Sequence, residues 1–286
     1  MRWLVTGSAG MLGTDMVALL RERGEDVTAA DRASLDITDP VAAHAAVAGH
    51  GVVVNAAAWT AVDAAETHEA DATAINGDGP RALATAARAH GARVVQISTD
   101  YVFDGTATTP YDESTDVAPV SAYGRGKAAG ERAVRETHPD GSLVVRTAWL
   151  YGAHGTCFPR TIARVAAERG GVEVVTDQVG QPTWTVDVAA VVHALVTADA
   201  PAGTYHATSS GQCSWFEFAQ AVVVAAGLES SVVAPTTSDA FVRPAPRPAY
   251  SVLGHAALDL VGVPPIADWA SRWAVAAPTV LGSPAG

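Results

Sequence analysis

The single lysine of this chain, Lys127, lies four residues after Tyr123 in the sequence Tyr-Gly-Arg-Gly-Lys. On a helix, this spacing places both side chains on one face, one turn apart. A compact ammonium ion beside a phenol favours the phenolate and lowers the phenol pKa from its usual value of about 10. The pair predicts a tyrosine that donates a proton to a developing alkoxide. A lone lysine on a solvated helix face is the alternative.

A glycine-rich loop near the start of the chain could hold a phosphate group. Gly7, Gly10 and Gly13 follow the apolar run 3–5 and open a helical pattern over 11–23. Glycines in such a strand–turn–helix unit allow a tight turn and let backbone N–H groups approach a pyrophosphate at the helix N-terminus. The loop therefore predicts a dinucleotide site, with a ligand-free glycine turn as the alternative.

An acidic residue follows the second apolar run at the distance expected for such a site. Asp31 comes directly after the run 27–30, and its carboxylate can accept the ribose 2′-hydroxyl of NADH. The next residue, Arg32, can instead meet the 2′-phosphate of NADPH. The Asp-Arg pair leaves the choice between NADPH and NADH open.

Short apolar runs alternate with helical patterns over the first two-thirds of the chain. The runs lie at 3–5, 27–30, 52–54, 93–97 and 143–146, and the helical patterns at 11–23, 39–48, 70–90 and 121–137. Apolar strands separated by helices predict a parallel sheet covered on both faces. We expect an α/β fold, a Rossmann-type doubly wound parallel sheet, with a smaller C-terminal α/β substrate-binding domain.

The sequence pattern changes after about residue 150. The predicted loops become longer there, and several prolines lie near residues 235–248. We expect an NAD(P)-binding domain over 1–150 and a mainly substrate-binding domain over 151–286. A helix at 186–197 should pack back on the first domain. Other expected elements are a strand at 173–176, a helix from 214 to about 226 opened by a capping box of Ser214 and Glu217, and a helix near 266–276.

Composition excludes several classes of protein. The chain has 286 residues, 49% of them hydrophobic, and a net charge of −12 without basic runs, so a general nucleic-acid or membrane-surface binder is not expected. Cys157 and Cys213 lie far apart without metal-ligand spacing, which favours free thiols. No apolar run approaches the roughly eighteen residues of a membrane span. With no signal peptide seen, we expect a cytoplasmic protein.

The glycine spacing and the Tyr-x3-Lys pair together resemble the extended short-chain dehydrogenase/reductase family. In that family a Ser or Thr upstream of the tyrosine completes the catalytic set, and Thr99 occupies that place just after the run 93–97. Asn76 matches a helix asparagine of many such reductases, with a helix-cap or core role equally open.

A narrower resemblance covers nearly the whole chain. It is carried by Asn55-Ala-Ala-Ala-Trp-Thr-Ala-Val-Asp-Ala-Ala-Glu66, Ser98-Thr-Asp-Tyr-Val-Phe-Asp-Gly105, Arg146-Thr-Ala-Trp-Leu-Tyr151 and Asp177-Gln-Val-Gly-Gln-Pro-Thr183. With these motifs the chain is similar to the dTDP-4-dehydrorhamnose reductase family. The resemblance implies NADPH- or NADH-dependent reduction of the 4-keto group of dTDP-4-dehydro-6-deoxy-L-mannose to give dTDP-L-rhamnose.

The resemblance also implies roles for single residues. Thr99 would bind the 4-keto oxygen, Tyr123 would donate the proton, and Lys127 would hold the nicotinamide ribose. Asp100 and Trp149 would contact the sugar nucleotide. The resemblance also places along the cofactor Gly10, Met11, Leu12, Asp31, Asp36, Ile37, Ala58, Trp59 and Thr60. Gly7 and Gly13 of the loop, Arg32, Tyr123 and Lys127 complete the predicted cofactor site.

One loop departs from the family. Where the family often has Arg-Pro-x-Asn-Ser, this chain has Arg247-Pro-Ala-Tyr250-Ser. Arg243 and Arg247 can bind the substrate diphosphate or face solvent. Because of Tyr250, a 4-ketoreductase that acts on another dTDP-deoxysugar stays an alternative. A regulatory subunit is a second alternative, because some relatives have the fold without catalytic activity. No clear carboxylate cluster predicts a metal site, but the use of Mg²⁺ stays open. The choice between monomer and homodimer is also open.

Overall fold

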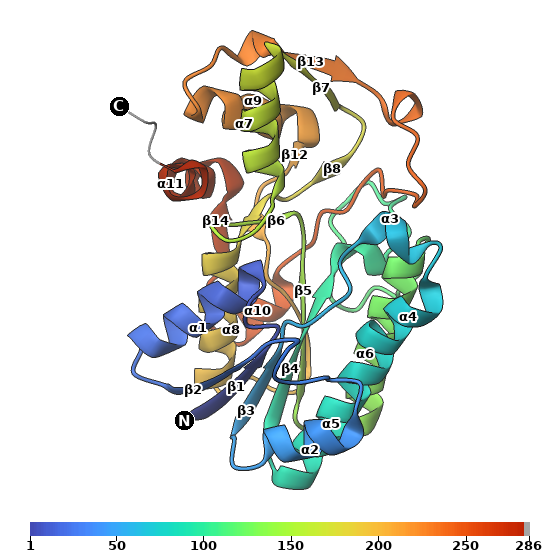
Figure 1. The fold of residues 1–286 in the computed structure, drawn as a ribbon, viewed down its shortest axis with the longest axis vertical. Helices are drawn as coiled ribbons and strands as arrows, with labels where there is room; N and C mark the ends of the chain where they lie inside the picture. The colour runs from blue at the N-terminus through green and yellow to red at the C-terminus, as the bar shows by residue number, and fades with distance from the viewer. Residues whose placement is uncertain (283–286) are drawn as a thin grey trace.

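The computed structural model describes residues 1–282, and its centre is a six-stranded sheet in which every strand pair is parallel (Figure 1). The strand order is β2-β1-β3-β4-β5-β10. The strands are β1 (Arg2–Thr6), β2 (Asp26–Ala30), β3 (Val52–Asn55), β4 (Arg93–Thr99), β5 (Ser142–Thr147) and β10 (Gly203–His206). The order reverses between β1 and β3, and ligands bind such sheets outside the carboxyl ends at this reversal. The predicted doubly wound fold is confirmed.

Helices cover both faces of the sheet (Figure 1). On one face lie α1 (Met11–Glu22) and α8 (Thr185–Thr197), and on the other lie α2 (Pro40–Val47), α5 (Gly79–His90) and α6 (Ala122–Thr137). Successive strand side chains point to opposite faces, so Trp3 and Val5 join the α1–α8 core while Leu4 joins the other. Burial on both faces explains why the strands read as continuous apolar runs.

The helical pattern at 70–90 contains a break that was not predicted. It consists of α4 (Glu69–Thr73), a π-helical turn η1 (Ala74–Asp78), and α5. The turn carries Asn76, and a Cβ added to Gly130 of α6 would collide with the Asn76 carbonyl oxygen. A single π-turn often marks a functional position, because it turns one side chain out of the regular helical register.

The second half of the chain surrounds a separate apolar cluster that includes Tyr151, Phe218, Val222 and Trp273. Its helices are α7 (Phe158–Arg169), α9 (Trp215–Ala225), α10 (Ala256–Leu260) and α11 (Trp269–Leu281). Its short strands are β6 (Leu150–Tyr151), β7 (Val172–Val175), β8 (Val179–Gly180), β9 (Thr183–Trp184), β11 (Ser209–Ser210), β12 (Cys213–Ser214), β13 (Val233–Thr236) and β14 (Ile266–Asp268). Four short pieces complete the described elements: α3 (Val62–Ala65) and the 3-10 turns η2 (Asp100–Val102), η3 (Ser230–Val232) and η4 (Ser238–Ala240).

Two details of this half bear on the sequence predictions. The capping box is confirmed, because Ser214 Oγ accepts from the Glu217 N–H while Glu217 accepts from the Ser214 N–H. The last helix starts later than predicted, because residues 266–268 pair with β11 as a strand. The chain also returns to the first half, since α8 packs on α1 and β10 extends the sheet beside β5. A domain boundary at residue 150 stays a prediction.

Across residues 1–282, none of the helices has the length and apolarity to cross a membrane.

Candidate active site

The loop between β1 and α1 is built so that only glycine fits at its critical positions. Gly7 has a φ of +66°, and a Cβ placed there would lie 2.6 Å from the Ala57 nitrogen. A Cβ on Gly13 would collide with the Gly7 carbonyl oxygen, and the Gly10 N–H donates to that same oxygen at 2.9 Å. Gly10 is the N-cap of α1 and has no side chain to occupy the first-turn N–H groups. The loop therefore fits a pyrophosphate, with Met11 and Leu12 on the first turn.

The acid after β2 has a structural task that the sequence did not reveal. Asp31 Oδ1 accepts hydrogen bonds from Ala33 N, Ser34 N and Ser34 Oγ, at 3.0, 3.0 and 2.9 Å. These bonds, the Ser34 hydroxyl first, hold the pKa of Asp31 below its usual range. The turn leaves Oδ2 for a ribose hydroxyl, and Arg32 beside it is exposed.

Of the next two predicted cofactor residues, Asp36 stabilises a turn and Ile37 packs in the core. Asp36 Oδ1 accepts from the Thr38 N–H at 2.9 Å and the Thr38 hydroxyl at 2.7 Å. The hydroxyl bond is the main reason that the Asp36 pKa is lowered. Ile37 is buried against Gly79 at the start of α5, so its side chain is a core contact.

The segment Ala58-Trp59-Thr60 is held in place by Asn76. Asn76 Oδ1 accepts from the Trp59 N–H at 2.8 Å, and its amide donates to the Trp59 carbonyl at 3.0 Å. The π-helical turn thus positions the backbone that would line the cofactor. Spacing along the sequence could not show this pairing, because the two segments meet only through the fold.

A buried line of side chains also runs from the carboxyl ends of β1 and β3 to the middle of β4. Thr6 Oγ1 donates to Asn55 Oδ1 at 2.6 Å, and the Asn55 amide donates to Gln96 Oε1 at 2.7 Å. This line links the three neighbouring strands next to the predicted cofactor crevice.

The predicted catalytic residues come together where β4 and α6 meet. Thr99 ends β4, and Tyr123 and Lys127 lie on the first two turns of α6. The helix begins at Ser121, whose Oγ accepts from the Gly124 N–H at 3.1 Å. A Cβ on Gly124 would collide with the Tyr101 carbonyl oxygen, so glycine at this position lets α6 approach the end of β4.

The electrostatics around Tyr123 differ from the prediction. Burial, with the charge of Asp100 as a smaller cause, raises the Tyr123 pKa to about 12, while the Thr99 hydroxyl opposes the rise. Lys127 is buried, its Nζ donates to the Ile97 carbonyl at 2.6 Å, and burial lowers its pKa to about 8. The predicted lowering of the Tyr123 pKa by Lys127 is not found, because the ammonium is directed at the Ile97 carbonyl.

Asp100 is a buried carboxyl group beside the same hydroxyl. Burial raises its pKa from 3.8 to about 6, and the side chains of Ser251 and Thr99 partly oppose the rise. Thr99 Oγ1 donates to Asp100 Oδ1 at 2.8 Å. A threonine hydroxyl has one proton, so Thr99 can donate either to this carboxylate or to a substrate oxygen.

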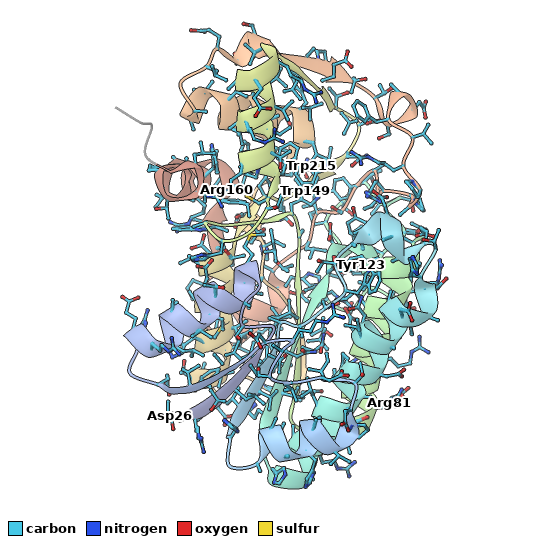
Figure 2. The ribbon with its side chains drawn as sticks, in the orientation of Figure 1. Asp26, Arg81, Tyr123, Trp149, Arg160 and Trp215 are labelled. Carbon is cyan, nitrogen blue, oxygen red and sulfur yellow. The ribbon has the colours of Figure 1, made fainter. Side chains whose placement is uncertain are left out.

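The second half of the chain contributes an aromatic wall. Trp149 has a φ of +47°, and its indole stacks on Trp215 with ring centroids 3.6 Å apart and planes 7° apart (Figure 2). A Cβ on Gly180 would collide with the Trp149 ring, so that residue also lies against the indole. A left-handed conformation at a bulky residue is strained, and here the stack holds it in place.

Arg247 lies in the proline-rich loop and is already paired. Its Nη2 donates to Asp63 Oδ1 at 2.9 Å, and its guanidinium lies 6.0 Å from the Tyr101 ring centre. Arg243 Nη1 lies 3.8 Å from Asp63 Oδ2. The Tyr101 ring in turn meets the Tyr123 ring edge-on, with centroids 5.6 Å apart. The loop thus reaches the neighbourhood of Tyr123 through Tyr101, and Asp63 holds it there, which was not predicted.

Tyr250, where the chain departs from the family pattern, is half-buried. Its hydroxyl donates to Gln212 Oε1 at 3.1 Å, and its backbone bridges to Val179, next to the Gly180 that lies against Trp149.

The structure therefore gathers buried Thr99, Asp100 and Lys127 and half-buried Tyr123 into one group. Asp31, Arg32 and Asp36 lie apart from it, after β2 at the far edge of the sheet.

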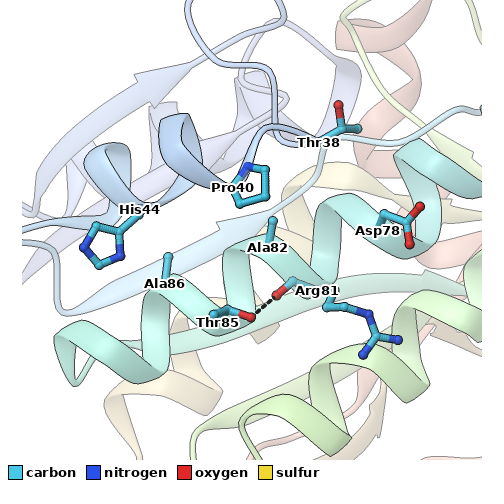
Figure 3. Close-up of a pocket in the computed structure, with 8 residues that line it drawn as sticks. All are labelled: Thr38, Pro40, His44, Asp78, Arg81, Ala82, Thr85 and Ala86. Carbon is cyan, nitrogen blue, oxygen red and sulfur yellow. Dashed lines mark hydrogen bonds between the residues drawn. The ribbon is translucent and has the colours of Figure 1, made fainter.

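Two other features carry no chemistry that competes with this group. A surface groove between α2 and α5 is lined by Thr38, His44, Arg81 and their neighbours (Figure 3). Within residues 1–282, no cluster of three or more His, Cys, Asp or Glu side chains could hold a metal ion.

Comparison with known proteins extends these observations over the whole chain. Residues 1–279 match the family model described as RmlD substrate binding domain. The chain is 49% identical to the dTDP-4-dehydrorhamnose reductase of Streptomyces griseus, over 98% of this chain and 94% of that protein. It is also 49% identical to a probable dTDP-4,6-dihydroxy-2-methyloxan-3-one 4-ketoreductase of Streptomyces antibioticus, over 98% and 96% of the two chains. The solved structure of dTDP-4-dehydrorhamnose reductase from Bacillus anthracis, in complex with NADP, matches with a TM-score of 0.92 at 37% identity, covering 96% of this chain and 98% of that one.

Proposed function

The chain belongs to the RmlD family of dTDP-4-dehydrorhamnose reductases, and we propose from this that it reduces dTDP-4-dehydro-6-deoxy-L-mannose to dTDP-L-rhamnose with NADPH or NADH. The observation that carries the proposal is the group of buried Thr99 and Lys127 and half-buried Tyr123 at the carboxyl end of β4. This is the end of a parallel sheet at which ligands bind.

The glycine loop and the first turn of α1 would hold the pyrophosphate of the cofactor, and the segment Ala58-Trp59-Thr60 would line its path towards Tyr123. The bound nicotinamide supplies a hydride to C4 of the sugar. Asp31 Oδ2 and exposed Arg32 lie where the adenosine ribose would be read, so this chain has a partner for a 2′-hydroxyl and one for a 2′-phosphate.

Tyr123 is the proton donor in this proposal. Because its pKa is about 12, the phenol stays protonated at neutral pH and its Oη carries the proton that the 4-oxygen requires. Thr99 donates a hydrogen bond to the same oxygen as negative charge develops there. Lys127, held at the Ile97 carbonyl, places a positive charge one helical turn from Tyr123 and binds the ribose of the nicotinamide.

The remaining substrate contacts come from both halves of the chain. Asp100 and the stacked Trp149 would meet the sugar, and Arg247, held in place by Asp63, would bind the diphosphate through its other N–H groups. We therefore assign cofactor binding mainly to residues 1–150 and sugar-nucleotide binding mainly to residues 151–286. A cytoplasmic enzyme, as a monomer or homodimer, is the form we expect.

The test is a reductase assay with dTDP-4-dehydro-6-deoxy-L-mannose, followed through the loss of absorbance of the reduced nicotinamide, with NADPH and NADH in parallel. We expect consumption of the reduced cofactor and dTDP-L-rhamnose as the product by NMR. Another reduced sugar would identify a different dTDP-sugar 4-ketoreductase. No consumption of either cofactor, with a stable complex to another enzyme, would favour a regulatory subunit.

The role of Tyr123 is tested by Tyr123→Phe, which removes only the phenolic oxygen. We expect turnover to fall by about 10²–10⁴-fold, the usual contribution of a positioned acid, with cofactor affinity retained. Tyr205→Phe is the matched control, because its hydroxyl bonds to the Pro201 carbonyl away from this site. Near-normal turnover in Tyr123→Phe would contradict the assignment.

A further inference from the structure

A fully buried ion pair lies directly beyond Lys127. Glu131 and Arg146 have exposed fractions of 0% and 1%, and they form two parallel hydrogen bonds, Nε to Oε1 at 2.9 Å and Nη2 to Oε2 at 2.8 Å. Ser98 Oγ adds a third bond, to Glu131 Oε1 at 2.5 Å. One carboxylate therefore joins α6, β5 and β4.

These three elements carry the residues that would perform the reaction. Ser98 lies between Ile97, whose carbonyl accepts from Lys127 Nζ, and Thr99. Lys127 lies one turn before Glu131 on the same face of α6. Any shift of Glu131 would therefore move both the acceptor of Lys127 and the hydroxyl of Thr99.

Stability is a weak explanation for this pair. Removing two charges from water costs several kcal/mol per ion, and a buried pair is often no better for stability than apolar residues of the same volume. Arg146 has no other carboxylate partner among the ion pairs of the described residues. On its other side it meets His206 Nε2 at 3.4 Å, and burial, with Arg146 as a further cause, lowers the His206 pKa to about 3. His206 is therefore neutral, and Glu131 is the carboxylate that forms an ion pair with Arg146, while the Arg146 charge acts on the more distant Glu113 carboxyl group only as a minor effect.

We propose that Glu131 is a positioning residue for the reductase, which ties β4, α6 and β5 together at Ser98 and Arg146 and keeps Lys127 an ammonium ion in its buried place. The catalytic part of this inference rests on the proposed function, whereas the effect on Lys127 is a property of the protein alone.

The charges around Lys127 support this role. Burial lowers its pKa to about 8, and the negative charge of Glu131 opposes that fall. From the other elements packed on α6, Arg146 of β5 and Asp100 of η2 are the buried ionisable groups that face the same region. The charged or titratable residues of α3, α4, η1 and α5 next to this helix are partly or fully exposed. They are Asp63, Glu66 at the end of α3, Glu69, Asp71, Asp78, Arg81, Arg88 and His90. Loss of the Glu131 charge would leave Arg146 unbalanced and make the ammonium ion harder to keep.

The single lysine of the chain makes the test direct. Lysine labelled with ¹³C at Cε gives one side-chain signal in the whole protein, and its pH titration reports Lys127 alone. We expect a midpoint near 8 in the natural protein and a midpoint lower by roughly one pH unit or more in Glu131→Gln. Glu69→Gln is the matched control, since Glu69 pairs with Arg125 on the exposed side of α6. A Glu131→Gln midpoint equal to that of the natural protein would overturn the proposal.

Ser98→Ala carries the test if Glu131→Gln does not fold, because it keeps the ion pair and removes only the bond to β4. We expect kcat to fall by roughly ten-fold with an unchanged KM for the cofactor, as for a misplaced catalytic group. An unchanged kcat would overturn the positioning role. The titration needs no substrate, so an absence of reductase activity in the natural protein would refute the proposed function and leave the lysine result standing.

Discussion

At the scale of single residues, the buried carboxyl group of Asp100 controls the hydroxyl that should meet the substrate. Thr99 donates its one proton to Asp100 Oδ1, while Asp100 has a pKa of about 6. Above that pH the carboxylate competes with the substrate oxygen for the same proton. The site thus keeps an ionisable group at a position where burial makes its charge costly.

Asp100→Asn tests how much stability the protein loses when the buried Asp100 carboxyl group ionises. The folded-state pKa of Asp100 is raised from 3.8 to about 6, so its contribution to stability is present below about 4 and is lost as the pH rises through 6. The variant should therefore be more stable than the natural protein above pH 6, by on the order of 2–3 kcal/mol, and equally stable near pH 4. Urea unfolding at both pH values measures this difference. An equal difference at both would contradict the assigned pKa.

Lys127→Arg tests whether position 127 requires a lysine or only a positive charge. Arginine keeps the positive charge but cannot place a compact ammonium at the Ile97 carbonyl, so we expect turnover to fall by roughly 10²-fold. In the natural protein, turnover should also decline above about pH 8 as Lys127 loses its proton. The arginine variant should show no such decline, because arginine stays protonated. Full activity with an unchanged pH profile would show that the lysine has no special role.

At the scale of elements, close backbone contacts decide where the site forms. Gly7, Gly13, Gly124 and Gly130 each stand where a Cβ would collide with another backbone segment. These contacts bring the loop before α1 against the segment after β3 and the first turn of α1 against that loop. They also bring α6 against the 3-10 turn after β4 and the π-helical turn.

Gly7→Ala compared with Gly24→Ala should isolate this effect. Both glycines have a positive φ, +66° and +76°, so alanine costs about 1–2 kcal/mol in either place. Only at Gly7 would the new Cβ also meet the backbone of Ala57, whereas nothing lies within 4 Å at Gly24. We expect Gly7→Ala to lose cofactor binding, measured by nicotinamide fluorescence, and Gly24→Ala to retain it. Normal binding by both would refute the loop as the pyrophosphate site.

At the scale of the whole molecule, two ion pairs join the halves of the chain near Tyr123. Asp63 of α3 lies 2.9 Å from Arg247 and 3.8 Å from Arg243 of the proline-rich loop. The loop is anchored at the site by these charges.

Asp63→Asn should loosen this anchor without touching the cofactor crevice. We expect the KM for the sugar nucleotide to rise by roughly 3- to 10-fold, since the loop must be ordered when substrate binds, while cofactor affinity stays unchanged. Glu168→Gln is the control, because it removes an exposed ion pair with Arg164 in α7. Equal kinetics for both variants would show that the loop needs no anchor.

Patterns along the chain predicted much of this fold because they come from local rules. The apolar runs became the buried strands, the glycine spacing marked the loop before α1, and Ser214 with Glu217 formed the predicted capping box. The π-helical turn was missed because its cause is Asn76 bonding to a distant backbone segment. The start of α11 was misplaced because strand pairing with β11 captured residues 266–268.

The sequence by itself determined which residues could do chemistry, because Tyr123 and Lys127 are related by one helical turn and Thr99 by the end of a strand. Only the tertiary structure decided their electrostatics. Burial raises the pKa values of Tyr123 and Asp100 and lowers that of Lys127. It also paired Arg247 with Asp63, and Glu131 with Arg146 and Ser98. Desolvation and ion pairing depend on which distant segments exclude water around a group, and no spacing along the chain contains that information.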